Sequence, residues 1–227
     1  MISLAIDTSM EAQVLGLRVG GEDVERFELA GREHSKIILS SILALLADAG
    51  VDKGSLDLII FGQGPGSFTG LRIAVGVVQG LAYGLDIPVV PVSTLACIAQ
   101  GEYRLSGAEH IVVAQAARKQ EVFFGSYAIE EGFAVLVGDE GVFEADAVPR
   151  QPFSECVGVG TGWVFREELE PALGATATRI VHEAFPQATD LLDLGTKGYA
   201  DGRAVSALEA RPEYLRERVA TPNVVSH

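Results

Sequence analysis

The segment from Gly62 to Arg72, with the sequence GQGPGSFTGLR, constrains the fold of this 227-residue chain more than any other feature. It follows a short apolar run at residues 58–61 and precedes a long apolar stretch at residues 73–85. Its concentrated glycines and proline favour a tight turn with backbone dihedrals that other residues resist. Thr69 is predicted to cap the helix that follows. The order strand, turn, helix indicates an α/β fold, in which this corner is either a simple turn or an anion site.

Apolar runs and turn residues predict the remaining elements. In the first half we expect strands at residues 2–7, 12–19, 24–30, 58–61 and 89–92, and helices at 34–49, at 69–85 and from about Ser93. In the second half we expect strands at 111–115, 121–128 and 133–143, a glycine-rich turn at 157–162, and helices at 163–170 and 188–202. This pattern alone predicts an α/β protein with a mixed sheet, whose second half looks like a shortened repeat of the first.

Composition excludes several classes of protein. With 48% hydrophobic and 21% charged residues, the chain is expected to be globular. A net charge of −14 argues against a protein that binds a nucleic-acid backbone by itself. Charged residues and prolines interrupt the most apolar window, residues 71–92, so no transmembrane helix is expected there. Cys97 and Cys156 are far apart in the sequence, which is more typical of buried thiols in a reducing cytosol than of a lone structural disulfide.

Further motifs accompany the glycine-rich segment. They are Ile6-Asp7-Thr8-Ser9 after the first strand, His34-Ser35 at the start of the first helix, Ala117-Arg118 with Glu121-Val122 in mid-chain, and Pro212-x-Tyr214-Leu215-Arg216-x-x-Val219-Ala220 near the end. Together with residues 62–72, this set closely resembles the bacterial TsaB (YeaZ) family over nearly all of the chain. The members of that family are paralogues of the TsaD-type threonylcarbamoyltransferases, within the actin/Hsp70/sugar-kinase superfamily.

The resemblance implies the fold and its division into domains. We expect an α/β, actin/Hsp70-like (ASKHA) fold of two ribonuclease-H-like domains, of which the second is reduced. Residues 1–104 would form the first domain and residues 105–204 the second. By the same resemblance, residues 205–227 would return to pack on the first domain.

The first helix bears on metal binding. In TsaD-type relatives, a His-x-x-x-His pair on this helix binds the metal, because residues i and i+4 share one helical face. The matching positions here are His34 and Ile38, and isoleucine cannot ligate a metal. The resemblance therefore implies no metal site and no catalytic residue. A single histidine at a helix start is more typical of a surface or capping residue.

Three short segments could belong to a vestigial nucleotide site, although each can also be an ordinary turn. They comprise Asp7, Thr8 and Ser9; Gly64, Gly66 and Ser67; and Gly158, Gly160 and Gly162. The mid-chain motif departs from the usual family form, because Ala116 replaces the aspartate before Ala117-Arg118. No cofactor is therefore expected on the isolated chain, whereas ATP or ADP could bind at an interface shared with a partner.

Two helices of the first half carry more apolar surface than a single sheet contact requires. In residues 34–49 the apolar positions cover well over half of the helix circumference. In residues 69–85 three glycines recur at every fourth position, although each costs about 1 kcal/mol relative to alanine. Either the helices cross each other within the monomer, or they bind another protein, which we favour. The predicted interface comprises His34, Ile38, Ile42, Leu45, Leu46, Arg72, Ile73, Gly76, Val77, Gly80, Tyr83 and Gly84.

The function that the resemblance implies is that of a non-catalytic subunit. Such a subunit is required to form N6-threonylcarbamoyladenosine at the adenosine following the anticodon of tRNAs. It would bind and activate a TsaD-type transferase together with a TsaE-type ATPase in the cytoplasm, and would meet tRNA only through that complex. In isolation the chain is expected to form a self-dimer through the same helices. Two enzymatic alternatives stay open: an M22-type metallopeptidase-like enzyme and an ATP-binding, kinase-like enzyme.

Overall fold

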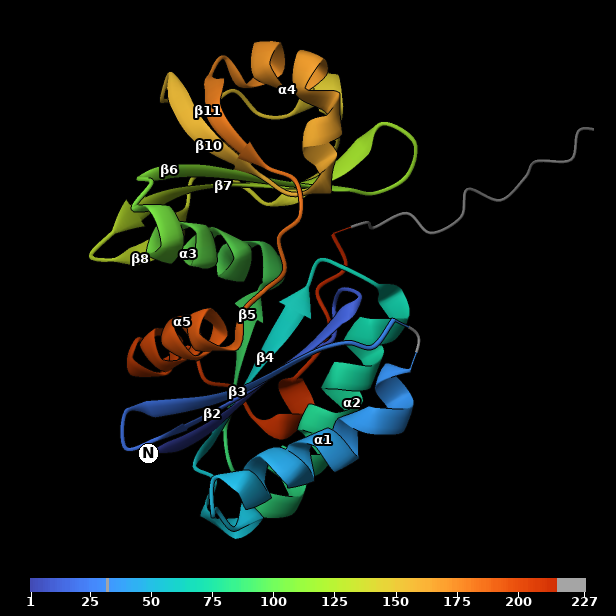
Figure 1. The fold of residues 1–227 in the computed structure, drawn as a ribbon, viewed down its shortest axis with the longest axis vertical. Helices are drawn as coiled ribbons and strands as arrows, with labels where there is room; N and C mark the ends of the chain where they lie inside the picture. The colour runs from blue at the N-terminus through green and yellow to red at the C-terminus, as the bar shows by residue number, and fades with distance from the viewer. Residues whose placement is uncertain (32, 216–227) are drawn as a thin grey trace, which may run out of the picture.

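The computed structural model describes residues 1–31 and 33–215, which form two β-sheets with helices on both faces of each (Figure 1). The first sheet has the strand order β3-β2-β1-β4-β5. Its strands are β1 (Ile2–Asp7), β2 (Ala12–Val19), β3 (Glu22–Leu29), β4 (Leu58–Gly64) and β5 (Val89–Ser93). Strand β1 pairs antiparallel with β2 and parallel with β4, and β4 pairs parallel with β5.

The second sheet repeats this topology. It has the order β11-β10-β6-β7-β8, with β9 paired to β7. Its strands are β6 (His110–Ala116), β7 (Glu121–Glu130), β8 (Phe133–Leu136), β9 (Gly141–Glu144), β10 (Glu155–Val159) and β11 (Thr176–Val181). The pairings also repeat, because β6 is antiparallel to β7 and parallel to β10, and β10 is parallel to β11. The predicted fold of two related α/β units is confirmed.

Alternation along the strands places apolar side chains on both faces of the first sheet. Leu4 and Ile6 of β1 belong to the core beneath the helices α1 (His34–Asp48) and α2 (Phe68–Leu85). Ala5, between them in sequence, belongs to the core on the opposite face, beneath α5 (Ala188–Ala200). The buried strands read as nearly continuous apolar runs because both faces of this sheet are covered.

Two helices lie between the sheets, and each packs on the other sheet than the one it follows in the chain. Helix α3 (Thr94–Ser106) directly follows the first sheet, yet its residues Leu95 and Ile98 pack in a core of the second sheet. Helix α5 comes after the second sheet, yet Leu191 and Leu192 pack on the first (Figure 1). On the outer face of the second sheet lies α4 (Arg166–Leu173). Helix α3 therefore covers the second sheet and α5 the first. The domain boundaries at residues 104 and 204 stay a prediction.

Beyond α5 the chain runs along the first sheet. Val205 pairs with Val89 of β5, and the Gln79 amide of α2 donates a hydrogen bond of 2.8 Å to the Ala210 carbonyl. The Glu213 N–H donates to the Gln63 carbonyl at 2.8 Å. Arg216, Val219 and Ala220 of the family-like tail, with the rest of residues 216–227, lie outside the described residues.

Several local predictions differ from the structure. Ser67, not Thr69, is the N-cap of α2, and its hydroxyl accepts a hydrogen bond from the Gly70 N–H at 3.3 Å. The strand expected at 133–143 is two strands, β8 and β9, separated by residues 137–140. The turn expected from residue 157 begins only after β10. The described residues also form the short 3-10 helices η1 (Lys53–Ser55), η2 (Ala145–Ala147), η3 (Thr161–Phe165) and η4 (Ala207–Glu209).

Candidate partner surface and interlobe cleft

Three glycines of the segment from Gly62 to Arg72 lie against the turn between β1 and β2. A Cβ atom added at Gly62 would lie 1.8 Å from the Asp7 carboxylate, and one added at Gly70 would lie 1.9 Å from the Thr8 carbonyl oxygen. At Gly66 the added atom would lie 2.3 Å from the Ser9 carbonyl oxygen. No other residue type fits at these contact distances. The spacing of four residues therefore serves close packing of the loop onto residues 7–9.

Residues 7–9 are themselves buried and bonded to protein groups. The Asp7 carboxylate accepts hydrogen bonds from the Ser9 N–H at 2.7 Å and from the Thr94 hydroxyl at 3.2 Å. The Thr8 hydroxyl donates to the Gly70 carbonyl at 2.8 Å. Burial raises the pKa of the Asp7 carboxyl above its usual range, against the lowering effect of these bonds and of His34. Of the two interpretations of this segment, the geometry favours a structural turn over a nucleotide loop.

The burial of the Asp7 carboxyl predicts that the stability of the protein depends on pH. A buried carboxyl with a raised pKa binds its proton more tightly in the folded state, so stability falls as pH rises from about 3.8 through the folded-state pKa. Asp7→Asn removes the titration and keeps an oxygen for the Ser9 N–H. We expect the free energy of unfolding of this variant, minus that of the wild type, to increase with pH and then level off. Urea denaturation between pH 4 and 8 measures the difference; a flat difference would contradict the assignment.

His34 is neither a surface residue nor a cap, contrary to the sequence-based expectation. Its side chain is buried, and Nε2 lies 3.0 Å from the Met10 carbonyl oxygen. Ile38, one turn later, is buried in the core beneath α1. Within residues 1–31 and 33–215, no group of histidine, cysteine and acidic side chains is arranged to hold a metal ion.

The glycines at 158, 160 and 162 also serve close packing. A Cβ at Gly158 would lie 2.4 Å from the Trp163 ring, whose Nε1 donates a hydrogen bond of 3.1 Å to the Val112 carbonyl. Gly160 has a φ of +109°, and an added Cβ would lie 2.4 Å from the Ala114 carbonyl oxygen. Here a side chain would strain the backbone and collide with β6.

A cleft of about 470 Å³ lies between the two lobes, where the segments following β1, β4, β6 and β10 meet. Ser9, Gly66, Gln115 and Thr161 are among its lining residues. Its described lining includes two carboxylates, from Glu11 and Glu183, and no lysine or arginine. In the nucleotide-binding members of an α/β superfamily, a cleft at strand ends is the usual ligand site. The charges of this cleft disfavour a polyphosphate on the isolated chain.

The helices α1 and α2 lie side by side on the outer face of the first sheet (Figure 1). Along α2 the predicted glycine row faces open space, because a Cβ added at Gly76, Gly80 or Gly84 would meet no atom within 4 Å. The alternative explanation for this row, a helix crossing within the monomer, is therefore wrong. Next to the glycines, Tyr83 is 71% exposed. On α1, Leu39 and Leu43 are 56% and 59% exposed.

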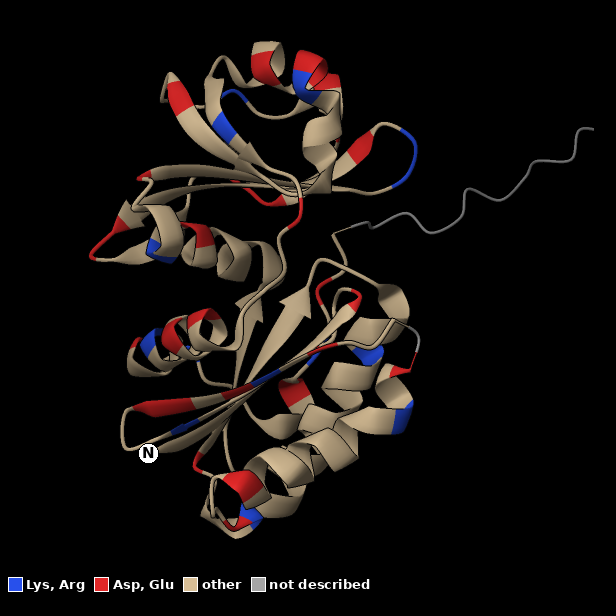
Figure 2. Ribbon diagram, viewed as in Figure 1, with Lys and Arg blue, Asp and Glu red and all other residues tan. Residues whose placement is uncertain are grey.

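We call the surface formed by Leu39, Leu43, Gly76, Gly80, Tyr83 and Gly84 the outer α1–α2 face. It carries no formal charge: α1 has none between Lys36 and Asp48, and Arg72 is the single charged residue of α2. Figure 2 shows both helices largely without charged positions. By length and composition α2 could even cross a membrane, with a mean hydropathy of 1.3 over 18 residues, of which 33% are buried. Its buried row packs in the core beneath α1 and α2, which identifies it as a helix of the folded domain.

Comparison with known proteins gives the family. The model of the TsaD family, tRNA N6-adenosine threonylcarbamoyltransferase, matches residues 28–143. The tRNA threonylcarbamoyladenosine biosynthesis protein TsaB of Haemophilus influenzae is 38% identical, over 95% of this chain and 94% of the relative. That of Escherichia coli K12 is 36% identical, over 96% and 95%. The chain belongs to the TsaB family. The structure of YeaZ from Pseudomonas aeruginosa, 39% identical, matches with a TM-score of 0.87 over 94% of this chain and 99% of that one.

In this TsaB-family chain, the structure divides the predicted interface residues into two groups. His34, Ile38, Ile42, Leu45 and Leu46 are buried within the first lobe, so the expectation that they form an exposed face is wrong. Ile73 and Val77 are half-buried, whereas Arg72, Gly76, Gly80, Tyr83 and Gly84 are exposed. Whether the exposed group binds a partner stays a prediction.

The interface predicted from the sequence does not include the exposed apolar residues of α1. Leu39 and Leu43 belong to the same wide apolar arc as Ile38 and Ile42, but they lie beyond the part that contacts the sheet. Their position one turn apart, at the edge of the arc opposite Leu45, was the available signal.

Proposed function

We propose that this chain is a non-catalytic subunit in the formation of N6-threonylcarbamoyladenosine at the adenosine following the anticodon of tRNAs. In this proposal it binds a TsaD-type transferase and keeps it in an active conformation, together with a TsaE-type ATPase, in the cytoplasm. Membership of the TsaB family supports a role in the biosynthesis of this modified nucleoside. The net charge of −14 supports indirect contact with tRNA, since phosphate contacts would have to come from the partners.

The observation that carries the proposal is the outer α1–α2 face. Two adjacent helices expose leucines, a tyrosine and a row of glycines with no formal charge. Glycines without neighbours do not contribute to the packing of the monomer, and each weakens the helix by about 1 kcal/mol relative to alanine. A second pair of helices could approach the backbone closely along this row. The same face would explain a self-dimer of the isolated chain, because one patch can serve an isologous contact.

The proposal that the chain supplies no catalytic group rests on two features. Asp7, at the position where the superfamily holds a magnesium ion, is fully buried and bonded to Ser9 and Thr94. Ile38 stands where the second metal-binding histidine of the transferases would lie. Any ATP or ADP would then bind at an interface shared with a partner.

Reconstitution tests the proposed function. Unmodified tRNA would be incubated with the transferase, the ATPase and the enzyme that makes threonylcarbamoyl-adenylate, with and without this chain. We expect modification, measured by mass spectrometry of nucleosides, to fall to background without the chain. Modification at full rate in its absence would contradict the proposal. Peptide hydrolysis or ATP turnover by the isolated chain would instead support one of the enzymatic alternatives.

A further inference from the structure

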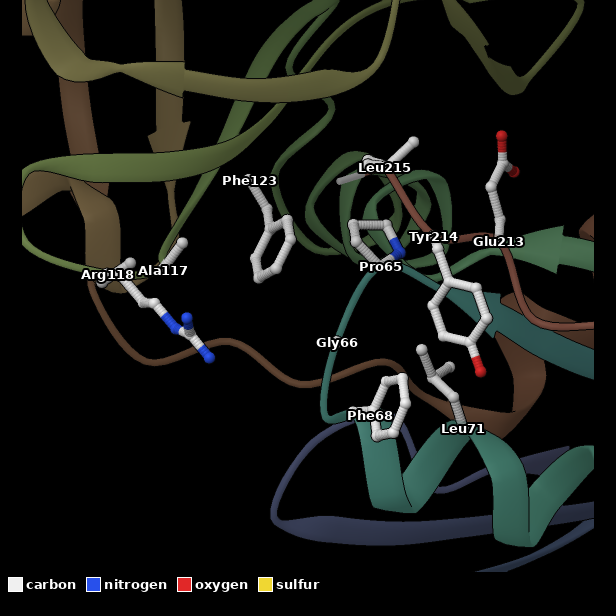
Figure 3. Close-up of a pocket in the computed structure, with 11 residues that line it drawn as sticks. Pro65, Gly66, Phe68, Leu71, Ala117, Arg118, Phe123, Glu213, Tyr214 and Leu215 are labelled. Carbon is white, nitrogen blue, oxygen red and sulfur yellow. The ribbon is translucent and has the colours of Figure 1, made fainter. Parts of the chain in front are cut away.

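A second cavity, of about 610 Å³, adjoins the interlobe cleft and is almost entirely apolar. Three segments far apart in sequence form its walls: the start of α2, the turn between β6 and β7, and residues 213–215. Figure 3 shows the rings of Phe68, Phe123 and Tyr214 around it. We call it the Phe123 cavity. Because Phe68 and Tyr214 are 51% and 44% exposed, the cavity leaves substantial aromatic surface in contact with solvent.

The wall next to α2 is held in place by Arg72. Its guanidinium lies 3.5 Å from the centroid of the Phe68 ring, and its Nε donates a hydrogen bond of 3.0 Å to the Tyr214 hydroxyl. The two rings also contact each other, with centroids 5.4 Å apart. This arrangement fixes both side chains before anything binds, which reduces the entropy cost of filling the cavity.

Arg118 is the one cation among the described residues that line this cavity. Its guanidinium lies at the rim beyond Phe123 (Figure 3). Among residues 1–31 and 33–215 its side chain forms neither an ion pair nor a hydrogen bond. Glu213, the one carboxylate of the described lining, already accepts a hydrogen bond of 2.8 Å from Gln63. In a protein of net charge −14, an apolar cavity with an unpaired guanidinium at its rim is complementary to an apolar group joined to a carboxylate.

We propose that the Phe123 cavity receives a large apolar side chain of the transferase partner, and that a neighbouring carboxylate of that partner binds Arg118. This inference rests on the proposed function, because it names the chemistry of the segment that the partner contributes. Few hydrogen-bonding groups converge in the cavity, so its lining offers little by which a small polar metabolite could be recognised. An aromatic-walled pocket beside an arginine is instead the arrangement that anchors protein interfaces.

Charge reversal at adjacent positions tests the ion pair. We expect Arg118→Glu to weaken association with the purified transferase about tenfold, because it places two carboxylates together at the cavity rim. Lys119→Glu makes the same change of net charge one residue away, outside the lining, and is expected to change association less than twofold. Isothermal titration calorimetry at physiological salt measures both. Equal weakening by the two variants would indicate long-range attraction only and would overturn the assignment of Arg118.

Photo-crosslinking identifies what occupies the cavity. With p-benzoylphenylalanine in place of Phe123, we expect a crosslink to a transferase peptide that contains a large apolar residue next to Asp or Glu. A crosslink to residues 216–227 of the same molecule, to a second copy of the chain, or to no protein would overturn the inference. If Arg118→Glu abolished ADP binding by the complex but left association unchanged, a small anion would be the ligand instead.

The two proposals can fail separately. If substitutions on the outer α1–α2 face weaken association but Arg118→Glu and the crosslink show no partner at the Phe123 cavity, the further inference fails and the proposed function stands. If the transferase does not associate with the wild-type chain at all, the proposed function fails.

Discussion

Replacing Gly70 with alanine is expected to destabilise the folded protein by about 3 kcal/mol. The added methyl group would lie 1.9 Å from the Thr8 carbonyl oxygen, a backbone atom that cannot rotate away. Thr8 is further fixed because its hydroxyl donates to the Gly70 carbonyl at 2.8 Å. Alanine gains about 1 kcal/mol over glycine in a helix interior, but the steric collision exceeds this gain. Urea denaturation followed by circular dichroism measures the change.

Gly76→Ala is the matched control, because it makes the same substitution two turns later in the same helix. An added Cβ at Gly76 meets no atom within 4 Å, so only the intrinsic helix preference operates. We expect this variant to be more stable than the wild type by about 0.5–1 kcal/mol. If both variants changed stability in the same direction, the close approach of residues 62–70 to residues 7–9 would not be the reason for the glycines.

The sequence alone predicts the positions of these glycines but not what they contact. Their density between Gly62 and Gly70 indicates a constrained backbone, and both a turn and an anion site are consistent with that. The decisive contact joins Thr8 to Gly70, 62 positions apart. Which buried atom lies opposite each glycine is a property of the sheet, since parallel pairing of β1 with β4 brings the two strand ends together.

The exchange of α3 and α5 illustrates a second limit. The sequence predicts a helix from about Ser93 and another at residues 188–202, and chain order then assigns each to the nearer sheet. The structure reverses that assignment, and an ion pair joins the two helices: the Arg104 guanidinium binds the buried Asp190 carboxylate at 2.8 Å. A charged residue such as Asp190 on a mostly apolar face indicates a contact, but its partner on another helix is not encoded locally.

The first helix shows how much of a binding surface periodicity can resolve. The apolar arc of residues 34–49 is correctly predicted to be wider than one contact requires. Periodicity does not say where the sheet contact ends, because Ile38 and Leu39 are equally apolar and adjacent. Tertiary packing decides it: Ile38 is 1% exposed and Leu39 56%. The glycine row of α2 can be located from the sequence alone. Glycine in a helix interior indicates that the backbone there is either closely contacted or exposed.

The outer α1–α2 face can be tested by adding bulk where the monomer leaves open space. We expect Gly80→Phe to weaken association with the transferase about 100-fold, equivalent to about 2.7 kcal/mol, because a ring on the glycine row prevents close approach of a second helix. Gly80→Ala adds one methyl group and should weaken association by a smaller factor. Calorimetry and gel filtration measure both variants, and any self-dimer should dissociate in the same order.

Stability and surface controls separate this effect from misfolding. An added Cβ at Gly80 meets no atom within 4 Å, so the monomer should keep or exceed its wild-type free energy of unfolding. Glu167→Phe places the same ring on an exposed position of α4 in the second lobe and should leave association unchanged. Wild-type affinity in Gly80→Phe, with a folded monomer, would show that the partner binds elsewhere. The apolar character of the two helices would then need another physical cause, since an uncovered face of this kind favours aggregation.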